Sequence, residues 1–293
     1  MISFSRMGCV AIIMVTVVAV GGCSSRQTVK NVAKGPASPE QVRSEAEQAL
    51  RYGDHAAALA AWQKILAKTP DDVAALRGIG EVYLAVGEHA TALAAFDKAL
   101  ELAPADPDAG EGRGLVLTAL GRHEEARRQL GVVQQASPSR WRTLNATGFL
   151  LDIEGKREQA WHSYEQALAL QPGHPLILNN MGHSLFMDHD YAEAERVFRD
   201  GLRSAPDGAY LHANLVLSIA WQGDYARALA EASRKQTREE ALNNVGYVAL
   251  LRKDYTAAIS YFEQAIEASP RWYPRAAANL ERARKEAEEA ARR

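Results

Sequence analysis

The stretch VAALRGIGEVYLAVGEHATALAAFDKALELAPAD, Val73–Asp106, decides how this chain folds. Counted from Val73 as position 1, its small and apolar residues fall at positions 4, 7, 8 and 11 and again at 20, 24 and 27. Both sets have the spacing of one face of an α-helix. Gly87-Glu88 separates them, and such a pair ends one helix and caps the next. The stretch therefore predicts two packed helices joined by a tight turn.

The pattern returns along the chain with a fixed period. Prolines at position 32 of five successive copies stand 34 residues apart: Pro70, Pro104, Pro138, Pro172 and Pro206. Proline cannot extend a helix, so each one ends a helix pair, and a period of this length is typical of stacked repeats. Pro270 comes four positions earlier than two full periods after Pro206 would place it. The sixth repeat should therefore be short in its second helix or in the turn that follows.

This chain resembles the tetratricopeptide repeat family in its spacing and in its residue types. The resemblance implies an all-α fold, a tetratricopeptide repeat superhelix (α-solenoid) of about seven helix-turn-helix repeats. Residues 39–272 are assigned to the repeats, and residues 273–293 to a C-terminal capping helix whose last residues are charged or alanine. The resemblance also implies that the first helices line a groove with their positions 2, 5, 6, 9, 12 and 13, which we call the inner positions.

Asparagine and aromatic residues recur at the inner positions of repeats 4 to 7. Asparagine is unfavourable inside a helix, so its recurrence indicates hydrogen bonding to a partner. The alternative, that asparagine stabilises the turn between repeats, stays open. We predict that these side chains lie in the groove rather than between helices. The predicted partner-binding groove consists of Asn145, Phe149, Asn179, Asn180, His183, Phe186, Asn214, Trp221, Asn243, Asn244 and Tyr247.

Repeat 3 departs most from the pattern. Its first helix carries Gly110 and Gly112, each of which costs about 1 kcal/mol against alanine in a helix interior. Arg113 occupies position 7, which is normally apolar. We predict that this helix is the least stable of repeats 2 to 6, and that Gly112→Ala stabilises it if position 6 faces the groove.

Residues 1–22 are predicted to be a signal peptide. Arg6 precedes the uncharged stretch Gly8–Val20, which is too short to span a bilayer. The tetrapeptide Val20-Gly21-Gly22-Cys23 resembles a bacterial lipobox, which implies that Cys23 is lipidated; a generic signal peptide with an incidental cysteine is the alternative. Residues 23–38 are predicted to be a flexible tether. Ser24 after the cysteine implies the outer membrane, with the repeats facing the periplasm.

Several classes of function have no support in the sequence. The 34 Lys and Arg balance 36 Asp and Glu, which argues against a nucleic-acid binder. Cys9 would leave with the signal peptide, so the mature chain has no cysteine nucleophile. His55, His89 and His123 share position 17 of successive repeats, and helices on the order of 10 Å apart cannot bring them to zinc-binding distance. No nucleotide-binding or catalytic motif is present, so we predict no enzyme, no cofactor and no metal.

Three stretches point to a narrower family: LNNMG at Leu178–Gly182, ALNNVGY at Ala241–Tyr247 and SPRWYPRA at Ser269–Ala276. They are similar to TadD-type lipoproteins of the Flp pilus (Tad) assembly machinery. This resemblance implies a scaffold, anchored to the membrane by its lipid only, that assembles or localises an outer-membrane secretin by binding a protein or peptide partner. A type IV pilus pilotin is similar in anchor, repeats and task. A structural adaptor in outer-membrane protein insertion or in cell-wall hydrolase complexes is the alternative.

Overall fold

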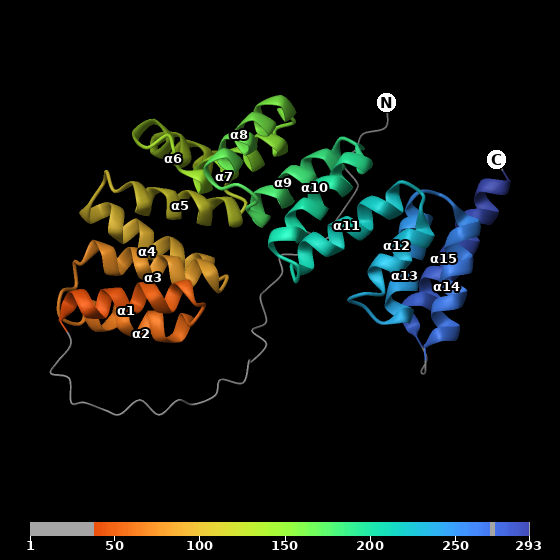
Figure 1. Cartoon of the computed structure of the whole chain (residues 1–293), viewed down its shortest axis with the longest axis horizontal. Helices are drawn as coiled ribbons and strands as arrows, with labels where there is room; N and C mark the ends of the chain where they lie inside the picture. The colour runs from red at the N-terminus through yellow and green to blue at the C-terminus, as the bar shows by residue number, and fades with distance from the viewer. Residues whose placement is uncertain (1–37, 270–272, 293) are drawn as a thin grey trace. The chain divides into compact units, whose positions relative to one another are not determined.

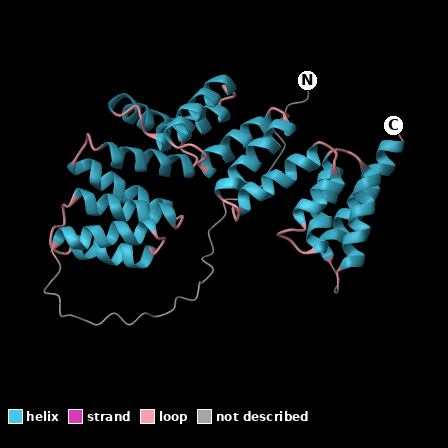
Figure 2. Cartoon of the chain, viewed as in Figure 1, coloured by secondary structure: helices cyan, strands magenta, loops and turns pink. Residues whose placement is uncertain are grey.

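The computed structural model describes residues 38–269 and 273–292, and within these ranges the chain forms fifteen helices and no strand (Figures 1 and 2). The predicted all-α fold class is confirmed. The chain divides into two compact units whose boundary, between Ser163 and Tyr164, lies inside α8 (Arg157–Leu170). The predicted signal peptide, Cys23, most of the tether and Pro270 lie outside the described residues. Among the helices described, none has the length and hydrophobicity needed to cross a membrane.

Successive helix pairs correspond to the predicted repeats. The first unit contains α1 (Pro39–Arg51), α2 (His55–Leu66), α3 (Val73–Ala85), α4 (His89–Leu102), α5 (Pro107–Ala119), α6 (His123–Ala136) and α7 (Trp141–Ile153). The second contains α9 (Pro175–Met187), α10 (Tyr191–Ser204), α11 (Ala209–Trp221), α12 (Tyr225–Ala232), α13 (Arg238–Leu251), α14 (Tyr255–Ala268) and α15 (Pro274–Ala291). Within each unit, a first helix contacts its own second helix and the first helix of the next repeat. Helix α12 has only 8 residues, which confirms the predicted short sixth repeat.

Most turns inside the repeats have the predicted chemistry. Asp54, Asp190, Asp224 and Asp254 each cap the second helix of a repeat by accepting a hydrogen bond from the backbone N–H three residues on. This satisfies one of the amide groups that a helix N-terminus leaves unpaired. Glu88, predicted to cap α4 in the same way, makes no such bond with its side chain. The sequence therefore specifies where each helix pair turns, and aspartate rather than glutamate supplies the cap.

Close packing between the helices of a repeat depends on glycine at position 8. A Cβ atom at Gly80 would lie 2.7 Å from the ring of Phe96, and one at Gly182 would lie 2.6 Å from the ring of Phe198. Both phenylalanines, at position 24, are buried. At Gly80 and Gly182, any side chain larger than hydrogen would therefore overlap the ring of the second helix.

Helix α5, predicted to be the weak element of the array, is tightly packed. A Cβ at Gly112 would lie 2.3 Å from the ring of Phe96, and one at Gly110 would lie 2.9 Å from side-chain atoms of α6. Position 6 of this repeat therefore packs against the preceding repeat instead of facing a groove. The condition on which Gly112→Ala is predicted to stabilise the helix, that position 6 faces the groove, is therefore not met. Arg113, at position 7, is paired with Asp97 at 2.6 Å.

Helix α15 follows the same register as the first helices. Ala276 and Ala283 are buried on α15, as Ala241 and Val248 are on α13. In α13 these residues hold positions 3 and 10, so Pro274 takes position 1 in α15.

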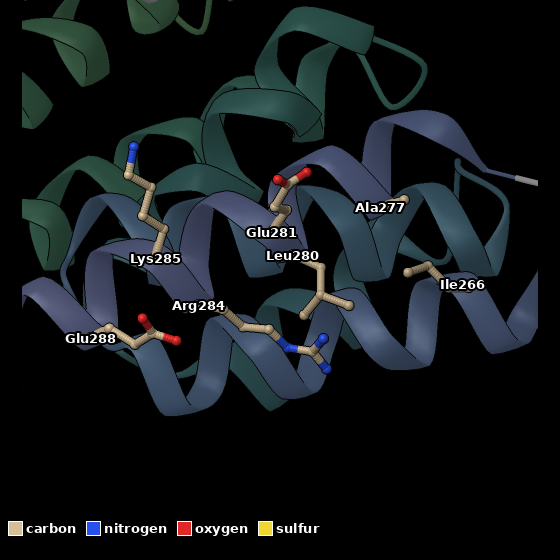
Figure 3. A pocket seen from close by; sticks show the side chains of 7 residues that line it. All are labelled: Ile266, Ala277, Leu280, Glu281, Arg284, Lys285 and Glu288. Carbon is tan, nitrogen blue, oxygen red and sulfur yellow. The ribbon is translucent and has the colours of Figure 1, made fainter.

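The face of α15 that would receive a second helix is charged. Glu281 occupies position 8, where most repeats have glycine, and Arg284 occupies position 11, where they have apolar residues. Figure 3 shows this face, where Leu280 of α15 and Ile266 of α14 line an open hollow together with Ala277 and four charged residues of α15. The charged residues Glu281, Arg284, Lys285 and Glu288 follow Leu280 along α15, as expected for the polar cap of a repeat array.

Candidate partner-binding faces

The inner positions of the first unit carry an ion-pair network. Arg142 of α7 donates two hydrogen bonds to the carboxylate of Glu81 on α3, both 3.0 Å long. Arg77 of α3 pairs with Asp108 of α5 at 2.8 Å, and Asp108 also binds Arg140. Bidentate arginine–carboxylate pairs are among the stronger ion pairs in proteins. The network therefore joins the first helices of repeats 2, 3 and 4.

Glu111 lies at the centre of this network and is only 6% exposed. Its carboxylate accepts a hydrogen bond of 2.8 Å from the Thr143 hydroxyl and one of 3.3 Å from Arg140. Arg142 lies 3.8 Å away. Burial lowers the pKa of Arg142, but the charges of Glu81 and Glu111 and the hydrogen bonds to Glu81 outweigh this and raise it above its usual value. The charged groups are thus neutralised within the unit.

Asparagines in the second unit pair with one another. Asn214 of α11 donates to the Oδ1 atom of Asn179 on α9 at 2.8 Å, and Asn279 of α15 donates to that of Asn243 on α13 at 3.0 Å. Asn243 is only 2% exposed. The expectation that all of these amides project into a groove is therefore wrong: the two pairs join neighbouring first helices. Asn145 of the first unit, 6% exposed, is buried as well.

Asn180 and Asn244 hold position 6 of their repeats and are more accessible. Asn244 is exposed and donates to Gln236 at 2.9 Å, while Asn180 is half-buried and accepts from Asn179 at 3.4 Å. His183 is exposed on α9 and Phe149 is half-buried on α7. A partner-binding role for these residues stays a prediction.

The predicted groove aromatics Phe186 and Trp221 form a cluster with Tyr191. The ring of Phe186 lies 5.1 Å from that of Tyr191 and 6.3 Å from that of Trp221, in edge-to-face contacts. Tyr191 stacks on Trp221 at 5.6 Å. The expectation that these two aromatics lie clear of the helix contacts is wrong, because they pack between α9, α10 and α11 at the half-buried edge of the core.

Trp221 of this cluster also belongs to a row of large apolar residues whose other two members are exposed. Met187, Trp221 and Leu251 occupy position 13 of three successive first helices, and we call them the apolar strip. Met187 is 50% exposed, Leu251 37%, and Trp221 less so. Arg252, next to Leu251, donates to the carbonyl oxygen of Trp221 and so links α13 to α11. Tyr247, 38% exposed, lies on the same helix as Leu251, at position 9.

The partner-binding groove predicted from the sequence does not include Leu251, although its position in the repeat, position 13, would have identified it as an inner residue. Position 13 is alanine in repeats 2 and 3, at Ala85 and Ala119, and becomes large and apolar from repeat 4 onward. A large exposed apolar residue that recurs at one position on successive helices indicates a surface that another molecule covers.

Metal binding finds no geometric support in the described part of the chain, where no cluster of three or more His, Cys, Asp or Glu could hold an ion. His55, His89 and His123 are the first residues of α2, α4 and α6, and the Nδ1 atom of each is buried. They contribute to packing at the helix starts.

The repeat register and the paired helices agree with comparisons of the sequence. The tetratricopeptide repeat family profile matches residues 44–107, 82–140, 154–209, 179–239 and 222–271, which together span more than half of the chain. This chain belongs to the tetratricopeptide repeat family. No curated protein matches it significantly.

Solved structures share the tetratricopeptide repeat fold with this chain. A tetratricopeptide repeat protein from Parabacteroides merdae is 19% identical, over 84% of this chain and 98% of that one, with a TM-score of 0.54. A thermophilic tetratricopeptide repeat protein from Thermus thermophilus is 21% identical, over 62% of this chain and 99% of that one, with a TM-score of 0.55. The structure of pilF from Pseudomonas aeruginosa is 20% identical, over 73% of this chain and 97% of that one, with a TM-score of 0.54. Identities at this level establish a shared fold alone.

Proposed function

We propose that this tetratricopeptide repeat chain is a lipid-anchored scaffold that holds a partner polypeptide against the inner positions of its second unit. Tetratricopeptide repeats suggest protein–protein interaction rather than catalysis. The observation that carries the proposal is the apolar strip, whose members Met187 and Leu251 are exposed while the charged inner positions of the first unit are paired internally. An exposed apolar surface beside accessible amides is typical of a peptide-binding site.

For the place of action we propose the periplasmic face of a bacterial outer membrane. Support comes from the lipobox-like sequence that ends at Cys23 and from Ser24 after it. The partner we propose is a secretin or another subunit of a Flp (Tad) pilus assembly machine, on the strength of the stretches LNNMG, ALNNVGY and SPRWYPRA. A type IV pilus pilotin would use the same anchor and the same surface.

Anchoring is tested by Cys23→Ser. The variant should fold normally, since Cys23 lies well before the first helix, α1 (Pro39–Arg51). It should move from the outer-membrane fraction to the soluble periplasmic fraction and lose its acyl mass. A variant that still sediments with outer membrane would contradict lipid anchoring.

Partner binding is tested at the apolar strip. Met187→Ser with Leu251→Ser should abolish in-cell crosslinking to the secretin and reduce secretin multimers. Val132→Ser is the matched control, because Val132 is 63% exposed but lies on the second helix α6. Crosslinking that survives the double substitution would place the partner elsewhere.

A further inference from the structure

Helix α12 is the shortest helix in the described part of the chain. It has 8 residues, whereas α10 and α14, the second helices of the neighbouring repeats, have 14 each. A helix of about two turns is not stable by itself in water, so it depends on tertiary contacts to stay folded. The contacts that α12 makes with its neighbours therefore decide how firmly it is held.

The apolar anchor that attaches the second helix in other repeats is reduced in α12. At position 24 the other six repeats have a large apolar residue, which is buried in each of them: Trp62, Phe96, Leu130, Tyr164, Phe198 and Phe262. Repeat 6 has Ala232 at this position, and Val216 takes position 8 of the facing helix α11, where most repeats have glycine. A large aromatic side chain buries about 150–250 Å² and an alanine far less, so apolar burial contributes less to the attachment of α12.

Charged groups supply much of the attachment of α12 instead. Arg227 donates two hydrogen bonds, of 3.1 and 2.8 Å, to the carboxylate of Glu195 on α10. The carboxylate of Glu231 lies 3.3 Å from Nε2 of the buried His212 on α11 and 3.9 Å from Arg199 on α10. The side chains of Arg227 and Arg199 are 46% and 42% accessible. Salt weakens ion pairs that have a partly exposed member, whereas apolar burial has no charge to screen.

The other helices of the second unit have contacts of their own that do not involve α12. Helix α11 contacts α9, α10 and α13 directly. Leu215 of α11 belongs to one buried cluster with Phe198 of α10 and Val245 of α13. Arg252 links α13 to α11 through the carbonyl oxygen of Trp221. These contacts would keep α9, α10, α11 and α13 together if α12 moved away.

We propose that α12 (Tyr225–Ala232) is a conformational strap, held by ion pairs, that opens and closes while the rest of the second unit stays folded. In a repeat array each repeat contacts only its neighbours, so one element can open without global unfolding. The strap connects α11 to α13, and its opening would loosen the link between two helices that carry the apolar strip. The strap does not depend on the proposed partner, because all of its contacts lie within the chain.

Hydrogen exchange of the full chain, followed by mass spectrometry, measures the opening. Residues 228–232 of α12 should exchange at least about tenfold faster than residues 258–262 of α14, which hold the same repeat positions and include the buried ring of Phe262. Raising NaCl from about 0.05 M to about 1 M should speed exchange at residues 228–232 about threefold and leave residues 258–262 unchanged. Equal exchange of the two segments, or an equal response of both to salt, would overturn the proposal.

Three variants test what holds the strap. Arg227→Gln removes the hydrogen bonds to Glu195 and should speed exchange at residues 228–232 about fivefold, with residues 258–262 unchanged. Arg284→Gln is the matched control, because it removes an ion pair of similar exposure between α15 and α14 and should leave residues 228–232 unchanged.

Val216→Gly with Ala232→Phe restores the glycine and the ring of the other repeats and should slow exchange at residues 228–232 about tenfold. No change on Arg227→Gln, or a change spread evenly over the second unit, would show that α12 is not a separate strap. Unchanged exchange in a folded double variant would show that the missing ring is not what leaves α12 weakly attached.

Discussion

Position 6 is glycine in repeats 2 and 3 of the first unit and asparagine in the repeats of the second, and the two residues make different contacts. A Cβ at Gly78 would lie 2.2 Å from the indole of Trp62, so an aromatic ring of the preceding repeat covers this position. Asn214, at the same position in repeat 6, instead donates a hydrogen bond to Asn179. Asn244, in repeat 7, is exposed. One register position thus serves core packing in one unit and presents amides in the other.

The first helices of repeats 2 to 4 also differ from those of repeats 5 to 7 in the charge of their inner positions. Those of α3, α5 and α7 include Arg77, Glu81, Asp108, Glu111, Arg142 and Asp152, whereas in α9, α11 and α13 only His183 and Glu240 can be charged near neutral pH. In the first unit, internal ion pairs cover surface that a partner could otherwise contact. The second unit leaves apolar and amide groups accessible. The difference teaches that a shared repeat fold does not imply a shared binding surface.

The largest expected effect tests the packing at position 6 in the first unit. Gly112→Ala should lower the free energy of unfolding by about 3 kcal/mol, because the new methyl group would overlap the buried ring of Phe96. Gly131→Ala on α6 is the matched control, since a Cβ there meets nothing within 4 Å, and it should stabilise by up to about 1 kcal/mol. Urea denaturation measures both. Equal effects would show that position 6 is not tightly packed.

Removing the central charge of the first unit should have the next largest effect. Glu111→Gln should destabilise by about 2 kcal/mol, since Arg140 and Arg142 lose a buried counter-charge. Glu124→Gln on α6 removes an exposed carboxylate, whose side chain is 70% accessible, and should change stability by less than about 0.5 kcal/mol. If the two substitutions cost the same, the network contributes no more than surface charge does.

A pH dependence is expected from Glu195 on the outer helices of the second unit. Its burial raises the pKa, but hydrogen bonds from Gln222 and Arg199 and the charge of Arg227 outweigh burial and lower it. A carboxyl whose pKa is lowered by folding stabilises the fold above its unfolded pKa of about 4.3, and this contribution is lost as the pH falls through the folded pKa.

Glu195→Gln should therefore lower the free energy of unfolding at pH 7 by about 1.5 kcal/mol. This is the lower end of the range for hydrogen bonds to charged groups, and we expect it because the arginine partners of Glu195 are partly exposed. The difference between wild type and variant should stay constant down to about pH 5 and shrink below about pH 4. Thermal unfolding across this range measures it. A difference that grows on acidification would contradict the direction of the pKa shift.

The smallest effects separate structural from accessible asparagines in the second unit. Asn243→Ala should cost about 1 kcal/mol, since it is buried and accepts from Asn279. Asn244→Ala removes an exposed side chain and should leave the melting temperature unchanged. Equal loss of stability in both variants would assign both amides to the fold.

The fold could be predicted from the sequence because its determinants are local and repeated. The aspartate caps act within three residues, and glycine at position 8 meets position 24 of the same repeat, 16 residues further along the chain. The candidate site could be predicted only in part. Register places Asn179 and Asn214 on inner positions, but it does not reveal that their side chains, 35 residues apart, reach each other. Nor does it show that Gly112 lies under Phe96, because that contact depends on how closely two repeats pack.

The charged face of α15 has a consequence for how such an array can grow. A duplicated repeat inserted between existing ones would meet glycine at position 8 on most of its neighbours and could be accommodated. A unit fused after α15 would instead set its first incoming helix against Glu281 and Arg284. Lengthening the protein by design would therefore begin with Glu281→Gly and Arg284→Leu. In evolution, duplication of an internal repeat is the route by which this binding surface could be extended.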